Sequence, residues 1–321
     1  MTEVEAPHEE LPPLDLRRLR DLDLAEPEPG SGASHIASAS GVAKRGDFVY
    51  VVGDDLLDLG VFELAGGRPG TLRRALRRPE PGGGGKPDLE GLTTLPPVEG
   101  EPDGGLLGLG SGSNRDRDRG FFWRLAPDGS LAHRPREIDL GPVYDRLREE
   151  LESDINIEGA AVLGRRLWLF HRANESSGPN AVAEFELGDL SRTLREDLVI
   201  DPEELARIRE YDLGDLDGVR ICFSDATALS HDLVCFCGSA EDEGGNIHGS
   251  VVGTISHDGR VRRLRAIDPR WKVEGVHATI DTGVIDFLFV CDQDDPDTAS
   301  PLLSATMPID RERDADRAQG H

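Results

Sequence analysis

The sequence is poor in positive charge, in aromatic residues and in long apolar runs. It has 62 Asp plus Glu against 36 Lys plus Arg, for a formal net charge of −26 over 321 residues. A chain this acidic is repelled by the phosphate backbone of nucleic acids and by anionic lipid. We therefore expect neither a nucleic-acid partner nor a membrane partner.

We also expect no membrane-spanning helix and no secretory signal. No apolar run approaches the roughly 20 residues that cross a bilayer as a helix. The first residues, "MTEVEAPHEELPP", are acidic and contain no apolar segment, so they do not read as a signal peptide. These features predict a cytoplasmic protein.

Cysteine is scarce, and its positions do not suggest a disulfide framework or a zinc site. The chain contains no Cys-x-x-Cys pair, and its cysteines lie in or beside apolar strand-like runs. We interpret them as small buried hydrophobic side chains. They are Cys222, Cys235, Cys237 and Cys291.

What the chain does have is an internal repeat. Three stretches, "DLEGLTTL", "NIEGAAVL" and "KVEGVHAT", place a glutamate and a glycine before a short apolar run, and "SASGVAKR" and "FSDATAL" align with them. The spacing between anchors is about 50 residues twice and about 67 residues twice. The anchor positions are Ser40, Glu90, Glu158, Asp225 and Glu274.

Each anchor is followed by further strand-like segments. The second segments are apolar and end in polar clusters, as in "RRLWLFHRANE", and third segments such as "GFFWRLAPDG" follow. Fourth strands are readable in "HRPREIDL" and "VRRLRAID", and more weakly in "TLRRALRR" and "TLREDLVI". Repeats of four antiparallel strands predict an all-β fold, a five-bladed β-propeller.

Two long intervals and the chain ends need separate explanations. The segments 141–154 and 201–212 have helical spacing, so we predict two short helical insertions. The segment 11–24 alternates Leu with polar residues, and we predict that it closes the ring as the outer strand of the last blade. The propeller domain would then cover 11–310, between disordered tails at 1–10 and 311–321.

The repeated acids allow two interpretations. Glu90, Glu158, Asp225 and Glu274 would meet at the central channel, where carboxylates need a cation or raise one another's pKa, so Ca²⁺ or Mg²⁺ is a candidate cofactor. Alternatively, they accept backbone N–H bonds from the next blade and lock the ring, with the following glycine allowing close approach.

Residues that differ between blades are better candidates for a specific site, because repeats preserve what builds the fold. They follow the second strands, which we expect to end on one face. His171 would move a proton, and Arg172 and Arg115 would hold an anion. The candidate ligand-binding residues are Asp54, Ser111, Asn114, Asn174, Glu175, His277 and Asp292.

These motifs resemble those of a known group of β-propellers. The glutamate–glycine strands, together with "LGLGSGSN" and "LFHRANE", resemble the bacterial phytase-like, or esterase-like, β-propellers, and in particular a branch without an assigned activity. The resemblance covers most of 11–308. Its phytase-like members imply calcium-dependent phosphoester hydrolysis, but this chain shows five repeats rather than six and no secretion signal.

Two functions follow as hypotheses. The first is a propeller that binds a small ligand or a protein partner on its polar face and performs no chemistry. The second is a divalent-metal-dependent hydrolase of a small anionic ester. We favour the first, because no nucleophile–base pair can be identified in the sequence.

Overall fold

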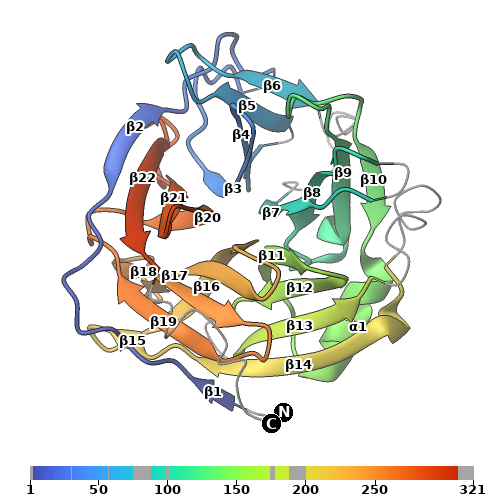
Figure 1. Ribbon diagram of the computed structural model, residues 1–321, viewed down its shortest axis with the longest axis vertical. Helices are drawn as coiled ribbons and strands as arrows, with labels where there is room; N and C mark the ends of the chain where they lie inside the picture. Colours follow the sequence, from blue (N-terminus) through green and yellow to red (C-terminus); the bar gives the residue numbers. More distant parts are fainter. Residues whose placement is uncertain are drawn as a thin grey trace.

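The chain folds into five small sheets that stand around a central opening (Figure 1). The computed structural model describes residues 3–29, 31–56, 58–74, 88–98, 101–173, 178–187 and 200–309. Successive strands within each sheet pair antiparallel, except for one short parallel strand added outside the third sheet. The five-bladed β-propeller predicted from the repeat is therefore confirmed.

The blades follow one another in chain order, and four of them begin with an inner strand. Blade 1 contains β3 (Ala39–Arg45), β4 (Phe48–Gly53), β5 (Asp58–Glu63) and β6 (Thr71–Arg74). Blade 2 contains β7 (Leu89–Leu95), β8 (Gly105–Gly110), β9 (Arg119–Arg124) and β10 (Arg136–Asp139). Blade 3 contains β11 (Ile157–Leu163), β12 (Arg166–His171), β13 (Asn180–Glu186) and β14 (Leu205–Asp212).

The last two blades complete the ring. Blade 4 contains β15 (Asp215–Leu216), β16 (Val219–Ala228), β17 (Leu233–Glu241), β18 (Ile247–Ser256) and β19 (Val261–Ala266). Blade 5 contains β20 (Val273–Asp281), β21 (Val284–Cys291) and β22 (Pro301–Pro308) from the end of the chain.

The ring is closed by a strand from the beginning of the chain, as predicted. β2 (Arg17–Asp21) pairs antiparallel with β22, and the two lie side by side in Figure 1. The flanking residues Leu22 and Leu24 are buried against blades 5 and 1. Since this strand is supplied from the other end of the sequence, closure joins the two ends of the propeller and covers the edge of β22.

Residues 3–10 differ from the expected disordered tail. β1 (Glu3–Glu5) pairs in parallel with β14 outside blade 3. Glu9 forms a buried ion pair of 2.8 Å with Arg263 of blade 4. The described part of this segment is therefore held against the outer strands. The tail predicted at 311–321 lies outside the described residues.

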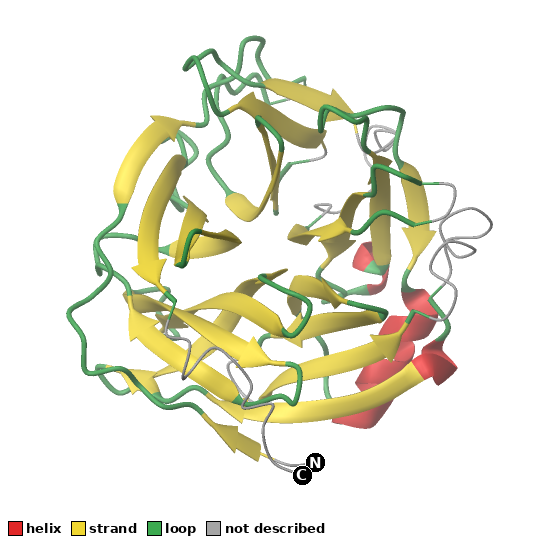
Figure 2. Cartoon of the chain, viewed as in Figure 1, coloured by secondary structure: helices red, strands yellow, loops and turns green. Residues whose placement is uncertain are grey.

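One of the two predicted helical insertions is confirmed and the other is wrong. α1 (Gly141–Leu151) buries Val143, Tyr144 and Leu147 against the outside of blades 2 and 3 (Figure 2). The segment 201–212 forms only a short 3-10 helix, η2 (Pro202–Glu204), and then continues as the outer strand β14. Pairing with β13 supplies the backbone hydrogen bonds of this segment, and this tertiary context overrides its helical spacing.

The pairing of β14 with β13 also corrects our prediction for the fourth strand of blade 3. We expected that strand in "TLREDLVI", whose first seven residues lie outside the described ranges, but the place beside β13 belongs to β14. The other predicted fourth strands, β6, β10 and β19, are in their expected blades.

The apolar core is divided among the blade interfaces. Five buried clusters each join the facing sides of two neighbouring blades. Large side chains such as Trp123 and Trp168 are fully buried within them. Because aromatic residues are few, most of the filling is Leu, Val, Ile and Ala. Cys235, Cys237 and Cys291 are buried free thiols, and Cys222 is partly exposed.

Candidate functional site

Every inner strand carries a β-bulge. In each one the pairing with the second strand skips a residue, as between Leu89 and Gly91 or between Val273 and Gly275. A bulge removes a residue from the ladder and redirects its side chain. The skipped residues are Ser40, Glu90, Glu158, Ser224 and Glu274.

Blade 4 departs from the predicted alignment by one residue. The skipped residue is Ser224, so Asp225 occupies the position that is glycine in the other blades. Its Oδ2 accepts the Val276 N–H of blade 5 at 2.9 Å, and its Oδ1 accepts the N–H of Ala226 at 2.7 Å. Asp225 therefore locks blade 4 to blade 5, and the ring contains three glutamates and two serines instead of four acids.

The glycines after the bulges allow the inner strands to approach one another. A Cβ built on Gly159 would lie 2.5 Å from the Ala226 nitrogen, and one on Gly275 would lie 2.7 Å from the Ser40 oxygen. Both distances are shorter than side-chain carbon atoms tolerate. The predicted structural role of the repeated glycine is thus supported at these positions.

Arg172 lies beside two of the ring glutamates, Glu158 and Glu274. Its Nη2 is 3.0 Å from Glu241 Oε2, while its Nη1 is 3.7 Å from Glu158 Oε2 and 3.9 Å from Glu274 Oε2. The three carboxylates come from blades 3, 4 and 5. Burial disfavours the charged form of Arg172, but these carboxylates hold its pKa above the ordinary value.

A second cation continues this network on blade 5. Lys272 Nζ lies 2.8 Å from Asp294 Oδ2, 3.3 Å from Asp292 Oδ2 and 3.7 Å from Glu274 Oε1. Although burial opposes it, Glu274 and the two aspartates raise the pKa of Lys272. Burial is also the main reason why the pKa of Asp292 is raised to about 6. Glu274 therefore lies between two fixed positive charges.

The pKa values of the other two ring glutamates, Glu158 and Glu90, are raised. Burial raises the pKa of Glu158 to about 8, with Glu274 and Asp88 adding to the rise and Arg172 opposing it. Burial also raises the pKa of Glu90, and the nearby carboxylates add to this effect. Burial and mutual repulsion favour the protonated form of carboxyl groups that are gathered in this way.

The expected Ca²⁺ or Mg²⁺ does not fit this arrangement well. Among the residues that the structure describes, no group of three or more His, Cys, Asp or Glu is placed to hold a metal ion. Two of the ring glutamates, Glu158 and Glu274, are already within 4 Å of the Arg172 guanidinium. A divalent ion at that point would meet a positive charge.

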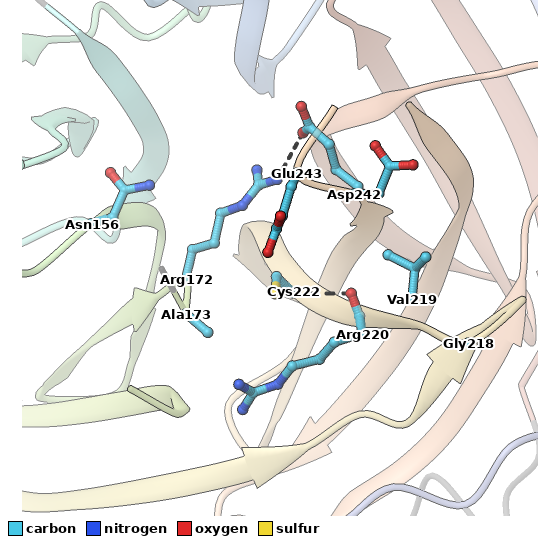
Figure 3. A pocket seen from close by; sticks show the side chains of 10 residues that line it. Asn156, Arg172, Ala173, Gly218, Val219, Arg220, Cys222, Asp242 and Glu243 are labelled. Atoms are coloured by element: carbon cyan, nitrogen blue, oxygen red, sulfur yellow. Dashed lines mark hydrogen bonds and ion pairs between the residues drawn. The ribbon is translucent and has the colours of Figure 1, made fainter. Parts of the chain in front are cut away.

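Beside Arg172 the surface opens into a cavity of about 630 Å³ between blades 3 and 4. Figure 3 shows Arg172 and Arg220 reaching into it, with Asp242 and Glu243 on another part of the wall. Asn156 and the partly exposed Cys222 also line it. Burial raises the pKa of the Cys222 thiol, so the thiol is protonated at neutral pH.

The His171 side chain binds the backbone of Asn156. It is buried, and its Nδ1 accepts the Asn156 N–H at 3.0 Å. Burial lowers the pKa of His171 to about 4, so the imidazole is neutral. Within the part of the chain that the structure describes, His171 is not among the residues that line the Arg172 cavity. Its proton-transfer role stays a prediction.

The candidates on blade 2 do not join Arg172. Arg115 is exposed and pairs with Asp118 and Asp145 near α1. Asn114 caps the short 3-10 helix η1 (Arg115–Arg117) by accepting the Asp116 N–H. Ser111 is buried, donates to Asp88, and its carbonyl accepts the Ile157 N–H of blade 3 at 2.7 Å. These three side chains have local structural contacts.

The remaining candidates divide between the ring and other places. Asp54 is close enough to contribute to the raised pKa of Glu90, and Asp292 joins the Lys272 network. His277 lies on the same strand as Glu274 but lines a different cavity. Asn174 and Glu175 lie outside the described residues.

Several residues of the network were not predicted. Lys272, Asp88 and Asn156 occupy corresponding positions, two residues before a ring glutamate, and Arg117 pairs with Asp88 at 2.8 Å. The sequence does contain a signal for Lys272, because it is one of three lysines in the chain and is the first residue of the repeated stretch "KVEGVHAT".

The fold and the charged network around Arg172 and Lys272 define the class of protein. It is a β-propeller with a charged site formed at its inner strands. More specifically, the chain belongs to DUF6929, a family of unknown function whose model matches residues 35–307. That match does not confirm the resemblance to phytase-like propellers. No curated protein matches the chain.

Solved structures resemble the chain in fold. The catalytic domain of the GH62 α-L-arabinofuranosidase of Coprinopsis cinerea is 9% identical with a TM-score of 0.52, over 92% of this chain and 98% of that one. The glutaminyl cyclase of Myxococcus xanthus is 12% identical with a TM-score of 0.46, over 93% and 100%. At these identities the likeness concerns the fold alone.

Proposed function

We propose that the protein is a ligand-binding propeller, and that its ligand is a small zwitterionic molecule bound in the cavity beside Arg172. The observation that carries this proposal is the pair of opposite charges on the cavity wall, Arg220 and Glu243, next to the fixed guanidinium of Arg172. Arg172 is held by acidic side chains from three blades, so its position is set before any ligand arrives. Such pre-organisation reduces the entropic cost of binding.

The charges on the cavity wall support a ligand with both signs of charge. Arg220 uses one of its nitrogens on the Gly178 carbonyl at 3.2 Å, which leaves the rest of its guanidinium for an acceptor group. Glu243 is exposed on the same cavity and is available to a positively charged amine. A ligand carboxylate would bind Arg220, and its amine would bind Glu243.

The acidic surroundings disfavour a purely anionic ester. The cavity wall carries Glu241, Asp242 and Glu243 against two arginines, and the whole chain carries a charge of −26. An anion would have to enter against this field. The hydrolase alternative assigned proton transfer to His171, but burial lowers the pKa of His171 to about 4, and His171 is not among the described residues that line this cavity.

A thermal-shift panel tests the proposal. Free amino acids, polyamines, neutral sugars and phosphate monoesters are each added to the full chain at pH 7. We expect the amino-acid class to raise the melting temperature with concentration, because a ligand of the native state stabilises it by mass action. Stabilisation by phosphate monoesters together with their cleavage would favour the hydrolase instead.

Variants at the cavity rim identify the site. Arg220→Gln and Glu243→Gln should each reduce the shift given by the best amino compound, because each removes one of the two charges that bind it. Glu137→Gln is the matched control, since Glu137 is an exposed acid on β10 of blade 2. An equal reduction in all three variants would place the ligand elsewhere.

A further inference from the structure

A second cavity, of about 540 Å³, lies between blades 5 and 1. Its walls come from β2, β3, β20, β21 and β22 and from the turn after β5. It shares no lining residue with the cavity beside Arg172. The closing strand β2 forms part of it, so this cavity exists only in the closed ring.

The charge of this cavity is opposite to that of the molecule. It is lined by Lys44, Arg17 and Arg20 and by a single acid, Asp286. Arg20 donates to the Arg68 carbonyl at 2.6 Å, so its hydrogen bonds are largely used. Among the described residues the Lys44 ammonium has no ion pair and no hydrogen bond. A local excess of positive charge in so acidic a chain favours an anionic occupant.

His277 provides the second observation. Its side chain lines the cavity and is only 6% exposed, and neither ring nitrogen has a hydrogen-bond partner among the described residues. Burying an imidazole without a partner is unfavourable, and native proteins rarely leave such groups unpaired. Burial, with a contribution from Lys44, lowers the pKa of His277 to about 4. A neutral ring can donate one hydrogen bond to an acceptor in the cavity.

Much of the rest of the wall is apolar, with Leu19, Leu64, Phe287, Leu288 and Ala305 beside three hydroxyl side chains. Leu19 and Leu64 line the cavity and are each 36% exposed. They are two of the four large hydrophobic side chains that the described chain leaves exposed. Their grouping at one cavity suggests that an apolar ligand body covers them.

We infer that this cavity binds a small amphipathic carboxylic acid, with its carboxylate at Lys44 and His277 and its hydrocarbon part against Leu19 and Leu64. The carboxylate accepts hydrogen bonds from the ammonium and from the imidazole N–H. The hydrocarbon removes the leucine side chains from water. This site is independent of the one proposed beside Arg172.

Calorimetric titration of the full chain with sodium octanoate tests the inference, with acetate and 1-octanol as comparison ligands. We expect saturable binding of one octanoate, at least tenfold tighter than binding of either comparison ligand. Each methylene that becomes buried should strengthen binding by up to roughly fourfold. Absence of saturable octanoate binding, or acetate binding as tightly, would overturn the inference.

Two neighbouring residues give a matched pair of variants. Lys44→Gln should weaken octanoate binding at least tenfold and leave octanol unchanged, whereas Arg45→Gln, on the next, exposed residue of β3, should change neither. Equal octanoate affinity in the two variants would contradict the site.

If Lys44→Gln does not fold, the wild-type protein still provides a test. The ring resonances of His277 in an NMR titration should shift as octanoate saturates the protein. Binding of octanoate without that shift would also contradict the proposal.

Discussion

The burial of Leu22 gives the sharpest test of ring closure. Leu22 follows β2, is 0% exposed, and packs in the cluster that joins blades 5 and 1. Its backbone N–H donates to the Ser300 carbonyl and its carbonyl accepts from Ile36. Leu22→Ala keeps these backbone bonds but removes the side chain, which for a fully buried leucine costs about 3 kcal/mol. For a chain of this length that is a fall in melting temperature of about 4–5 °C.

Leu19→Ala is the matched control, because Leu19 lies on β2 itself and is 36% exposed. It should cost less than about 1 kcal/mol, since a partly exposed side chain loses less burial. Thermal unfolding followed by circular dichroism, together with urea titration, measures both variants. The reasoning is refuted if Leu22→Ala unfolds like the wild type, or if the two variants are equally destabilised.

Three further predictions concern the ring. Asp225→Ala should lower the free energy of unfolding by about 1–3 kcal/mol, because the buried Val276 N–H loses its acceptor. Urea titration measures this change, and wild-type stability of the variant would show that the contact does not lock the blades. Because folding raises the pKa of Glu158 from 4.5 to about 8, the native state keeps a proton that the unfolded chain releases, so the free energy of unfolding should fall as pH rises between these values. Glu158→Gln should flatten that part of the stability profile relative to Glu137→Gln, and parallel profiles would contradict the assignment. EDTA, Ca²⁺ and Mg²⁺ should leave the melting temperature unchanged, and a concentration-dependent rise with either ion would restore the metal hypothesis.

The fold was predictable because its determinants are local and repeated. Each second strand is an apolar run followed by a polar cluster, and this pattern survives unequal loops. The closing strand was predictable because 11–24 alternates Leu with polar residues and blade 5 ends one strand short. The strand in segment 201–212 was not predictable. Leu205, Ile208 and Tyr211 recur every third residue, which favours a helix, but pairing with the edge of the sheet outweighs this local preference.

The candidate site was only partly predictable. The glutamates could be found from their repetition, and Arg172 from its place after a buried strand. The alignment of Asp225 with them was wrong, because the position of a β-bulge depends on pairing between strands and not on residue type. Arg172, Lys272 and Glu241 come from three different blades. Their proximity depends on how the blades pack, so it could not be predicted from their positions in the sequence.

A crystal structure of the protein with the amino compound that stabilises it most tests the central claim most directly. We expect ligand density in the cavity beside Arg172, with a carboxylate on Arg220 and an amine toward Glu243. Arg172 should remain between Glu158, Glu241 and Glu274. Density for a metal ion bound by the ring glutamates, with Arg172 displaced, would contradict this account.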